Sequence, residues 1–250
     1  MAELPEAIIL AGGLGTRMRE VLGEHAKSMA LLNGRPFLET LFKQLKKAGY
    51  SQAILSVGYK HEQIRDHFGD ESCGLKLIYS REEKPLGTGG GVRLALNHVA
   101  ADNVLVMNGD SYTDVKIASV IKQHDKRKPA ATIVVIPQSR FDAGSIVLGT
   151  KKIVTHFGEK VALPGSRYIN AGIYILDKTL FKDVSAREAV SIEKQLFPAW
   201  LAEGRKIEGY VHKGTCTDIG TPQRYKDAQE SLRRAEQEIH DNLVRKARSL

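Results

Sequence analysis

The sequence has few cysteines and no long apolar run, and these absences exclude several classes of protein. Only Cys73 and Cys216 are cysteines, which is too few for a disulfide scaffold, and their neighbours lack metal-binding spacing. No apolar run approaches the length that crosses a membrane. The first residues place glutamate and proline before an apolar run, unlike a signal peptide. We therefore expect a cytoplasmic protein in a reducing compartment, without membrane contact.

Motifs of several nucleotide-binding folds are also missing. Met18 stands where the dinucleotide fingerprint G-x-G-x-x-G has its third glycine, and no Gly-Lys-Ser/Thr of a P-loop follows. The predicted strand at residues 53–57 ends Val57-Gly58-Tyr59, without the acidic residue that a dinucleotide-dependent oxidoreductase needs there. Internal repeats, including the hexapeptide repeats of a β-helix, are absent.

Composition and charge are those of an ordinary globular protein. Hydrophobic residues make up 42% and charged residues 26% of the 250 residues, typical of one sizeable α/β domain or two small ones. The net charge of +8 favours nucleotides, sugar phosphates or nucleic acid as partners, or serves solubility alone. The basic residues are dispersed and not interleaved with aromatics, so we expect no nucleic-acid partner.

A glycine-rich loop follows the first predicted strand. The apolar run at residues 7–11 predicts a fully buried strand. Gly12, Gly13 and Gly15 follow, and a backbone without Cβ can approach a ligand closely. Backbone N–H groups after a strand favour an anion, and Arg17 adds a planar fork of donors suited to phosphate. The loop predicts a cradle for a nucleoside triphosphate, with a plain tight turn as the alternative.

Strands and helices alternate through the first half of the chain. Apolar runs predict strands at residues 7–11, 31–32, 53–57, 75–79, 104–107 and 131–136. Helical spacing predicts helices from Pro36 to Ala48, at residues 62–68, after a second glycine-rich loop at residues 85–91, and at residues 115–127. This alternation predicts a parallel sheet with right-handed crossovers.

The second half has a different character. Residues 145–155 and 168–176 predict strands of an antiparallel addition. A helix at residues 191–201 and a last strand at residues 206–211 follow. From Arg224 we expect a long charged helix whose narrow apolar stripe packs on the body or forms a homodimer contact. We therefore divide the chain into a domain at residues 1–225 and a C-terminal helix at residues 226–250.

Charged residues at strand ends and in loops are candidate site residues. Asp110 and Asp218 each follow a predicted strand, where carboxylates can hold Mg²⁺ against phosphate oxygens or merely occupy a turn or cap. Lys27 can face a leaving pyrophosphate, or be solvated. Glu159 and Lys160 can meet a sugar hydroxyl and a sugar phosphate, or form an ordinary pair of loop charges.

Taken in order, these segments resemble the sugar-1-phosphate nucleotidylyltransferase family. The matching segments cover residues 7 to about 225 and are Leu10-Ala11-Gly12-Gly13-Leu14-Gly15-Thr16-Arg17, Lys27, Pro85-Leu86-Gly87-Thr88-Gly89, Asn108-Gly109-Asp110, Asn170-Ala171-Gly172 and Asp218-Ile219-Gly220-Thr221-Pro222. The bacterial D-glycero-α-D-manno-heptose 1-phosphate guanylyltransferases are similar at Arg35-Pro36-Phe37-Leu38-Glu39, Asn108-Gly109-Asp110-Ser111-Tyr112 and Ser191-Ile192-Glu193-Lys194. The resemblance implies a Rossmann-like three-layer α/β/α fold with a mixed, mostly parallel sheet and a small antiparallel addition that binds the sugar.

The resemblance also implies an activity and a role for each matching residue. A sugar 1-phosphate displaces pyrophosphate from the α-phosphate of GTP, with Mg²⁺ as cofactor. Arg17, Lys27 and Asp110 act in catalysis, and Asp110 and Asp218 hold the metal. The nucleotide is bound by Leu10, Gly12, Gly13, Gly15, Thr16, Glu82, Gly87, Thr88 and Gly109. The sugar phosphate is bound by Glu159, Lys160, Asn170 and Glu193.

Two points leave alternatives open. Guanine presents N1–H and N2–H₂ donors to Glu82, or to its rival Glu83. The family has proline on both sides of the catalytic lysine, whereas this chain has Ala26-Lys27-Ser28, so we expect a more flexible loop. Alternatives are mannose 1-phosphate with GTP, another sugar with UTP or dTTP, and a non-catalytic nucleotide- or nucleic-acid-binding protein.

Overall fold

Strands and helices alternate along most of the chain. The computed structural model describes residues 4–231 apart from 138–143, 160, 162 and 186. The strands are β1 (Glu6–Leu10), β2 (Leu31–Leu32), β3 (Arg35–Pro36), β4 (Gln52–Val57), β5 (Glu71–Ser72), β6 (Leu75–Arg81), β7 (Asn103–Asn108), β8 (Ser111–Thr113), β9 (Ala131–Pro137), β10 (Ser145–Leu148), β11 (Val154–Gly158), β12 (Tyr168–Asp177), β13 (Ile207–Val211) and β14 (Cys216–Asp218).

The helices vary more in type. The α-helices are α1 (Arg19–Leu22), α2 (Phe37–Lys47), α3 (His61–Phe68), α4 (Gly87–Ala95), α5 (Ile117–Arg127) and α6 (Phe197–Ala202). Short 3₁₀ turns are η1 (Thr16–Met18), η2 (Lys27–Met29), η3 (Leu96–His98), η4 (Thr150–Lys152) and η5 (Lys178–Phe181), and η6 (Ile192–Leu196) is a π-helical turn.

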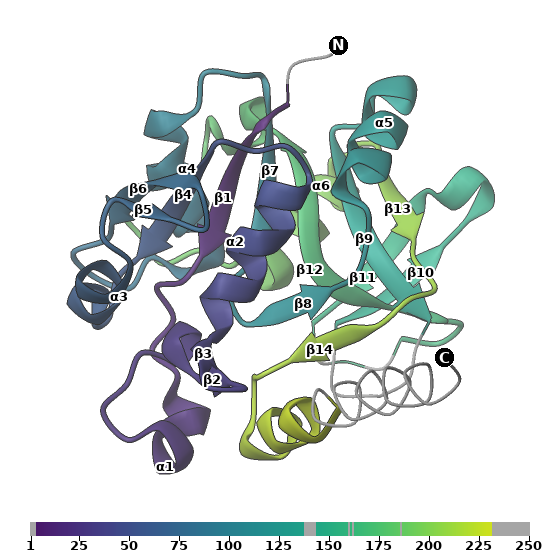
Figure 1. The fold of residues 1–250 in the computed structure, drawn as a ribbon. Coiled ribbons are helices and arrows are strands. Elements are labelled where there is room, and N and C mark those ends of the chain that lie inside the picture. Colours follow the sequence, from purple (N-terminus) through teal and green to yellow (C-terminus); the bar gives the residue numbers. More distant parts are fainter. Residues whose placement is uncertain (1–3, 138–143, 160, 162, 186, 232–250) are drawn as a thin grey trace, which may run out of the picture.

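A ten-stranded sheet forms the centre of the described structure (Figure 1). Its order is β11-β10-β12-β7-β1-β4-β6-β5, and β9 pairs with both β12 and β13. β1, β4, β6 and β7 are parallel neighbours, and β9, β10 and β13 run in the same direction. β5, β11 and β12 run the other way. The sheet is therefore mixed and mostly parallel, as expected.

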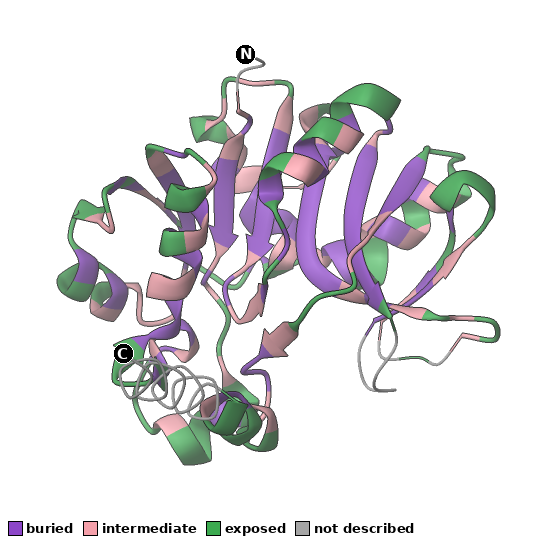
Figure 2. Ribbon diagram, turned by 45° about the vertical axis from the view of Figure 1, so that its right-hand side comes forward, coloured by how far each residue is buried: buried purple, intermediate pink, exposed green. Residues whose placement is uncertain are grey.

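Helices cover both faces of this sheet, because its strands are apolar on both sides. Ala7 and Ile9 of β1 belong to the apolar cluster that contains α2, α3 and α5, whereas Ile8 belongs to the cluster with α4 and α6. Successive strand residues point to opposite faces, so an unbroken apolar run needs cover on both sides. Figure 2 shows these buried strands between helices whose outer faces are exposed. The three-layer α/β/α arrangement is confirmed.

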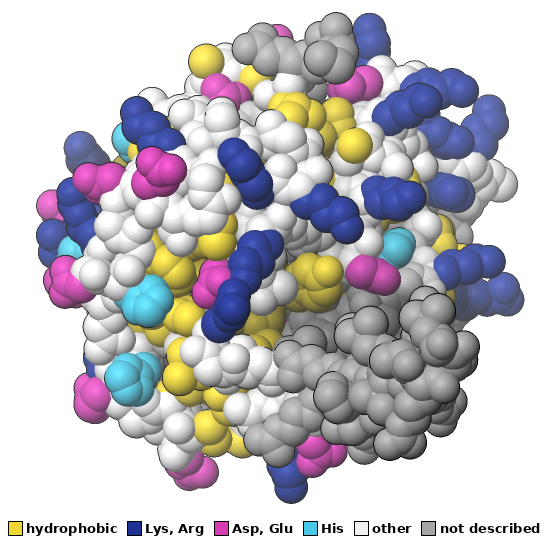
Figure 3. Space-filling view, in the orientation of Figure 1, with side chains coloured by type: hydrophobic (Ala, Val, Ile, Leu, Met, Phe, Trp, Pro, Cys, Tyr) yellow, Lys and Arg dark blue, Asp and Glu magenta, His cyan; other side chains and the backbone are white. Residues whose placement is uncertain are grey.

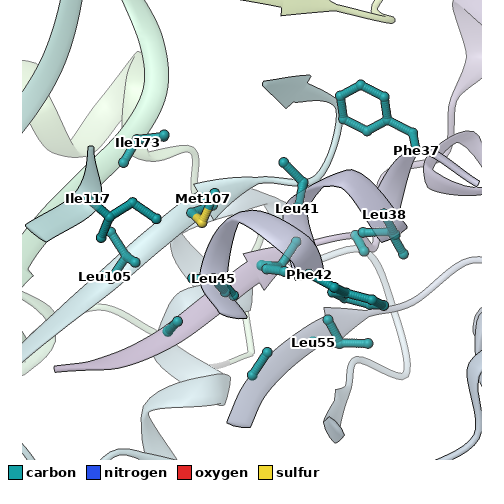
Figure 4. Close-up of a cluster of buried hydrophobic side chains, with 14 of the residues drawn as sticks. Phe37, Leu38, Leu41, Phe42, Leu45, Leu55, Leu105, Met107, Ile117 and Ile173 are labelled. Carbon is teal, nitrogen blue, oxygen red and sulfur yellow. The ribbon is translucent and has the colours of Figure 1, made fainter. Parts of the chain in front are cut away.

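Helix α2 shows how the local sequence builds one of these layers. Five apolar side chains at helical spacing are almost fully buried in one apolar cluster (Figure 4): Phe37, Leu38, Leu41, Phe42 and Leu45. Each contributes roughly 1.5–3 kcal/mol by leaving water. The helix ends where Gly49 takes a φ of +96°, and Pro36 precedes the first helical residue instead of lying in the first turn.

The second glycine-rich segment is a helix, not the loop that the sequence predicts. Gly87–Ala95 forms α4, and Gly89, Gly90 and Gly91 are buried in it. A Cβ on Gly89 would lie 3.0 Å from the Val190 carbonyl oxygen, and a Cβ on Gly91 would lie 2.8 Å from Ser56 Oγ. The glycines therefore let the helix pack closely against its neighbours, which outweighs their low helix propensity.

Strand predictions in the second half needed correction. Residues 145–155 form two strands, β10 and β11, because Gly149 and the left-handed residues Lys151 and Lys152 turn the chain between them. β10 is antiparallel to both β11 and β12, as expected, and β12 joins them to the main sheet by pairing with β7 and β9, with an irregularity at the predicted small-residue break. β14, which the sequence did not predict, pairs with β8 in a two-stranded ribbon.

The chain after β14 begins the predicted C-terminal helix. Residues 222–231 are helical, Ala228 is buried in the core, and Tyr225 Oη donates to the Leu31 carbonyl oxygen over 2.7 Å. This part therefore packs on the body, and the rest of the predicted helix, with its apolar stripe, lies outside the described residues. Among the described residues, no helix combines the length and apolar character that crossing a membrane requires.

Candidate active site

The glycine-rich loop lies at the carboxyl ends of β1 and β7. Gly109 N donates to the Leu10 carbonyl oxygen over 2.9 Å. A Cβ on Gly109 would lie 2.5 Å from that oxygen, so only glycine allows the strands to approach so closely. Gly15 has a left-handed φ of +59° and begins the turn η1, which carries Thr16 and Arg17. The loop thus follows a rigid strand end and leads directly to the predicted phosphate-binding arginine.

A cavity of about 410 Å³ opens beside this loop. Gly220, two residues after Asp218, lines it. All residues predicted for catalysis or nucleotide binding also line it, namely Leu10, Gly12, Gly13, Gly15, Thr16, Arg17, Lys27, Glu82, Gly87, Thr88, Gly109 and Asp110. Residues from distant parts of the sequence therefore meet at one cavity.

The β8–β14 ribbon brings the two predicted metal ligands together beside this cavity. Asp110 precedes β8, and Asp218 ends β14 opposite Ser111. Ile219 N donates to the Asp110 carbonyl oxygen over 3.0 Å, which extends the pairing. Asp218 stands just behind the lining, because a Cβ on Gly220 would lie 2.9 Å from Asp218 Oδ1.

Each carboxylate has a cation beside it. Lys27 Nζ donates to Asp110 Oδ2, and Arg224 Nη1 lies 3.1 Å from Asp218 Oδ1. Burial alone would raise the pKa of Asp110, but the Lys27 ammonium, a neighbouring hydroxyl and Arg17 together lower the pKa below its ordinary value. Asp110 is therefore ionised at neutral pH.

The donor set fits a magnesium ion. Mg²⁺ takes one or two protein carboxylates and fills its other positions with substrate phosphates and water. Asp110 and Asp218 supply two carboxylates beside a cavity that the glycine-rich loop also lines. The described residues contain no cluster of three or more histidine, cysteine, aspartate or glutamate side chains that could hold a metal. Phosphate oxygens would have to complete the shell.

The segment around Lys27 is held by contacts instead of by flanking prolines. Ala26 and Ser28 are buried. Gln63 on α3 binds the segment twice: its Oε1 accepts from Ala26 N over 2.8 Å, and its Nε2 donates to the Glu24 carbonyl oxygen over 2.8 Å. The backbone before Lys27 is thereby fixed from a neighbouring helix.

Glu82 lies under the glycine-rich loop. Its Oε1 lies 2.8 Å from the position of a Cβ on Gly12 and 2.5 Å from that of a Cβ on Gly58. Its Oε2 accepts a hydrogen bond from Leu86 N over 3.1 Å. Burial raises the pKa of this carboxyl group. The rival residue Glu83 is not among the residues that line the cavity.

Thr88 connects the cavity to a buried hydrogen-bond network. Thr88 Oγ1 donates to Glu193 Oε2 over 2.7 Å, and Ser191 Oγ donates to the same oxygen over 3.0 Å. Tyr174 Oη donates to Glu193 Oε1 over 3.3 Å and accepts from Asn170 Nδ2 over 2.6 Å. Burial, and then the Glu193 carboxylate, raises the pKa of Tyr174 well above its ordinary value. Glu193, predicted to face the sugar, thus faces three hydroxyl groups inside the protein.

The other predicted sugar residues lie at the same side as this network. A Cβ on Gly144 would lie 2.9 Å from Glu159 Oε2 and 3.5 Å from Asn170 Cβ, so these two side chains are neighbours. Lys160 lies outside the described residues. Glu159, Asn170 and Glu193 do not line this cavity. They lie next to one another, and Thr88 connects Glu193 to the cavity.

Three site residues were missed by the sequence analysis. Arg224 carried a usable signal, because it lies in the first turn of the predicted helix after Asp218. Gln63 and Tyr174 carried none. The contact of Gln63 with Ala26 joins positions 37 apart in sequence, and no local pattern marks such a pair.

This arrangement defines a class of protein: an α/β protein with its cavity beyond the carboxyl ends of parallel strands, the position where such folds bind nucleotides. The chain belongs to the Nucleotidyl transferase family, whose profile matches residues 6–235. It is therefore an enzyme, and the non-catalytic alternatives are set aside.

Relatives of the chain agree with this assignment. It is 37% identical to the D-glycero-alpha-D-manno-heptose 1-phosphate guanylyltransferase of Aneurinibacillus thermoaerophilus over 91% of this chain and 98% of that protein. It is 34% identical to the mannose-1-phosphate guanylyltransferase of Mycobacterium tuberculosis over 88% of this chain and 62% of that protein. The crystal structure of HddC from Yersinia pseudotuberculosis complexed with GMP-PN matches with a TM-score of 0.80 and 31% identity, over 92% of this chain and 100% of that one.

Proposed function

We propose that this enzyme transfers GMP from GTP to a sugar 1-phosphate, D-glycero-α-D-manno-heptose 1-phosphate, and releases pyrophosphate and GDP-heptose. The observation that carries the proposal is the meeting of the glycine-rich loop, two cations and two carboxylates at one cavity. The similarity to a heptose 1-phosphate guanylyltransferase along nearly the whole of both chains supports the choice of sugar. A cytoplasmic location and a role in capsule or lipopolysaccharide precursor supply are part of the same proposal.

The chemistry that we propose is an in-line displacement. An oxygen of the sugar 1-phosphate forms a bond to the α-phosphorus, and the bond from that phosphorus to the bridging oxygen breaks, so pyrophosphate leaves with the electron pair. No covalent enzyme intermediate is required, and the protein contributes positioning and charge neutralisation. Arg17 and Lys27 would hold the phosphates while negative charge moves to the leaving group.

The metal has a defined place in this proposal. Asp110 and Asp218 would hold Mg²⁺, which when bound neutralises charge on the phosphate oxygens. Lys27 contacts Asp110 in the structure. With the metal ion neutralising the Asp110 carboxylate, the Lys27 ammonium would be available to the phosphates.

Glu82 is the residue that we assign to guanine recognition. Its half-buried carboxylate lies at the cavity wall beside the glycine-rich loop. An ionised carboxylate is acceptor-only, which matches the two adjacent donors of guanine, N1–H and N2–H₂; the other bases do not present two adjacent donors on that edge. The ribose would lie against Gly12, Gly87 and Thr88, which line the same cavity.

The sugar would be bound on the side of Glu159 and Asn170. Their carboxylate and amide groups are suited to sugar hydroxyls, and Lys160 would meet the phosphate. Glu193 acts in this proposal through Thr88 and Tyr174, which it holds in place.

A pyrophosphate-release assay with ATP, CTP, GTP, UTP and dTTP and several sugar 1-phosphates tests the proposal. We expect release with GTP and the heptose 1-phosphate. GTP with mannose 1-phosphate is the second candidate, favoured by the similarity to the mycobacterial enzyme. Release with UTP or dTTP alone would overturn the guanine assignment, and no release with any pair would overturn the proposed function.

A further inference from the structure

Arg224 reaches the active-site wall from a part of the chain to which the proposed mechanism gives no role. Its guanidinium Nη1 lies 3.1 Å from Asp218 Oδ1, and only 18% of its side chain is exposed. Three groups converge on the lining residue Gly220: a Cβ there would lie 2.9 Å from Asp218 Oδ1, 3.4 Å from Arg224 Nη1 and 3.9 Å from Lys27 Nζ. Arg224 and Lys27 therefore approach the same wall.

The backbone fixes Arg224 in this position. Arg224 N donates to Thr221 Oγ1 over 3.3 Å at the start of the helical residues 222–231. The helix is fixed in turn by the buried Ala228 and by Tyr225, whose hydroxyl donates to the Leu31 carbonyl oxygen. The guanidinium is therefore held by a packed helix, and its contact with Asp218 is not a chance meeting of surface charges.

Asp218 Oδ1 is held from two directions. Gly220 N donates to it over 2.9 Å, and Arg224 Nη1 donates to it over 3.1 Å. A charge-assisted hydrogen bond to a guanidinium fixes a carboxylate more firmly than a neutral one does. The same positive charge weakens the attraction of this carboxylate for any other cation. Arg224 thus orients the candidate metal ligand and also opposes metal binding.

We propose that Arg224 is a positioning residue of the active site, which orients Asp218 and competes with a divalent cation for its carboxylate until the nucleotide binds. The inference rests on the proposed function for its link to turnover. In the structure, Asp110 is paired with Lys27 and Asp218 with Arg224. The triphosphate brings negative charge that attracts both cations. Metal affinity is therefore coupled to nucleotide binding, and metal alone binds weakly.

Binding of Mn²⁺ to the nucleotide-free protein, followed by electron paramagnetic resonance of the unbound ion, tests this inference. Arg224→Gln removes the charge, and we expect it to bind Mn²⁺ about tenfold more tightly than the natural protein does. Its kcat should fall while KM for the sugar phosphate changes little, because Asp218 is no longer oriented. Arg224→Lys retains a charge and should stay near the natural protein in Mn²⁺ affinity.

Arg127→Gln is the matched control. Arg127 also pairs with a buried carboxylate, Glu208, at 3.4 Å, but it lies on α5, on the side where Figure 3 shows lysine and arginine side chains gathered. This variant should leave Mn²⁺ affinity and kcat unchanged, whatever it does to stability.

Several results would overturn the inference. Unchanged or weaker Mn²⁺ binding by a folded Arg224→Gln protein would do so, as would failure of both proteins to bind Mn²⁺ at millimolar concentrations. If Arg224→Gln does not fold, Arg224→Lys becomes the test. A loss of kcat together with weaker Mn²⁺ binding in Arg224→Lys would indicate that Arg224 has a structural role only. The Mn²⁺ measurement needs no turnover, so it reports on Arg224 even if the proposed reaction does not occur. If the enzyme is active but Arg224→Gln and the natural protein bind Mn²⁺ equally well, only this inference is overturned and the proposed function stands.

Discussion

The two walls of the active site are built in different ways. The first wall consists of residues 10–17, Glu82, Gly87, Thr88 and Asp110, most of them in segments that directly follow strands of the parallel part of the sheet. The second wall consists of Asn170, Tyr174, Glu193 and Asp218, which depend on β12, η6 and β14. The second wall meets the first through contacts such as Thr88 with Glu193, 105 positions apart.

This difference separates chemistry from positioning. The first wall offers its groups to the cavity, so its side chains are available to a substrate. In the second wall, Tyr174 and Glu193 are buried, and the Tyr174 hydroxyl donates a hydrogen bond to the Glu193 carboxylate. We therefore expect substitutions in the first wall to lower turnover or change specificity with little loss of stability. Substitutions in the second wall should lower stability as well.

Asp110→Asn should give the largest effect. It removes a negative charge beside Lys27 and leaves that ammonium without its carboxylate. We expect kcat to fall about 10³-fold, because the proposed metal site would lose one of its two carboxylates, while the melting temperature stays within a few degrees. Pyrophosphate release and a thermal melt measure the two. Asp102→Asn, at an exposed carboxylate, is the control and should keep normal turnover. Near-normal turnover of Asp110→Asn would contradict the proposal that Asp110 is a metal ligand.

The sequence was sufficient for the first wall because its signals are local. An apolar run followed by Gly12, Gly13 and Gly15 predicts both the buried strand and the loop, and the same reasoning places Asp110 after β7. The second glycine-rich segment was misread as a loop, because only the packed structure shows that Gly89 and Gly91 allow close contact with Val190 and Ser56.

Glu193→Ala should give the second largest effect, and it should appear in stability. The change leaves the hydroxyl groups of Thr88, Ser191 and Tyr174 without their shared acceptor. Loss of buried hydrogen-bond partners predicts a fall of about 3 kcal/mol in the free energy of unfolding, measured by urea denaturation. Glu188→Ala, at an exposed position in the segment before η6, should be neutral. Equal stability of the two variants would show that the second wall does not depend on Glu193.

The second wall could not be read from the sequence for a physical reason. The paths of β12 and β14 are set by pairing with β7 and β8, far away in the chain. The run at residues 145–155 was predicted as one strand although Gly149 lies within it, because Lys151 and Lys152 take a left-handed φ without being glycine. Asp218 was nevertheless predicted from its motif, and Arg224 beside it was not.

Glu82→Gln should change specificity more than rate. Glutamine offers one donor where guanine needs acceptors, so we expect the preference for GTP over ATP to fall about tenfold. Glu83→Gln is the control and should keep the preference. Since burial raises the pKa of Glu82, its ionised form is lost at a higher pH than for an exposed glutamate as the pH falls. The GTP preference of the natural protein should therefore decline on the acid side of the pH profile, and a preference independent of pH there would contradict this role.

Gln63→Ala should give the smallest effect and sharpens the comparison, because it tests whether even the first wall needs a distant contact. Gln63 fixes the backbone before Lys27 through Ala26 N and the Glu24 carbonyl oxygen. Its loss should lower kcat about two- to fivefold by loosening Lys27. Ala26 has a φ of −61°, which proline adopts without strain, so adding Ala26→Pro to Gln63→Ala should restore much of kcat: the N–H that proline lacks has by then already lost its acceptor. If the proline restores nothing, Lys27 is positioned by its contact with Asp110 and not by the backbone before it.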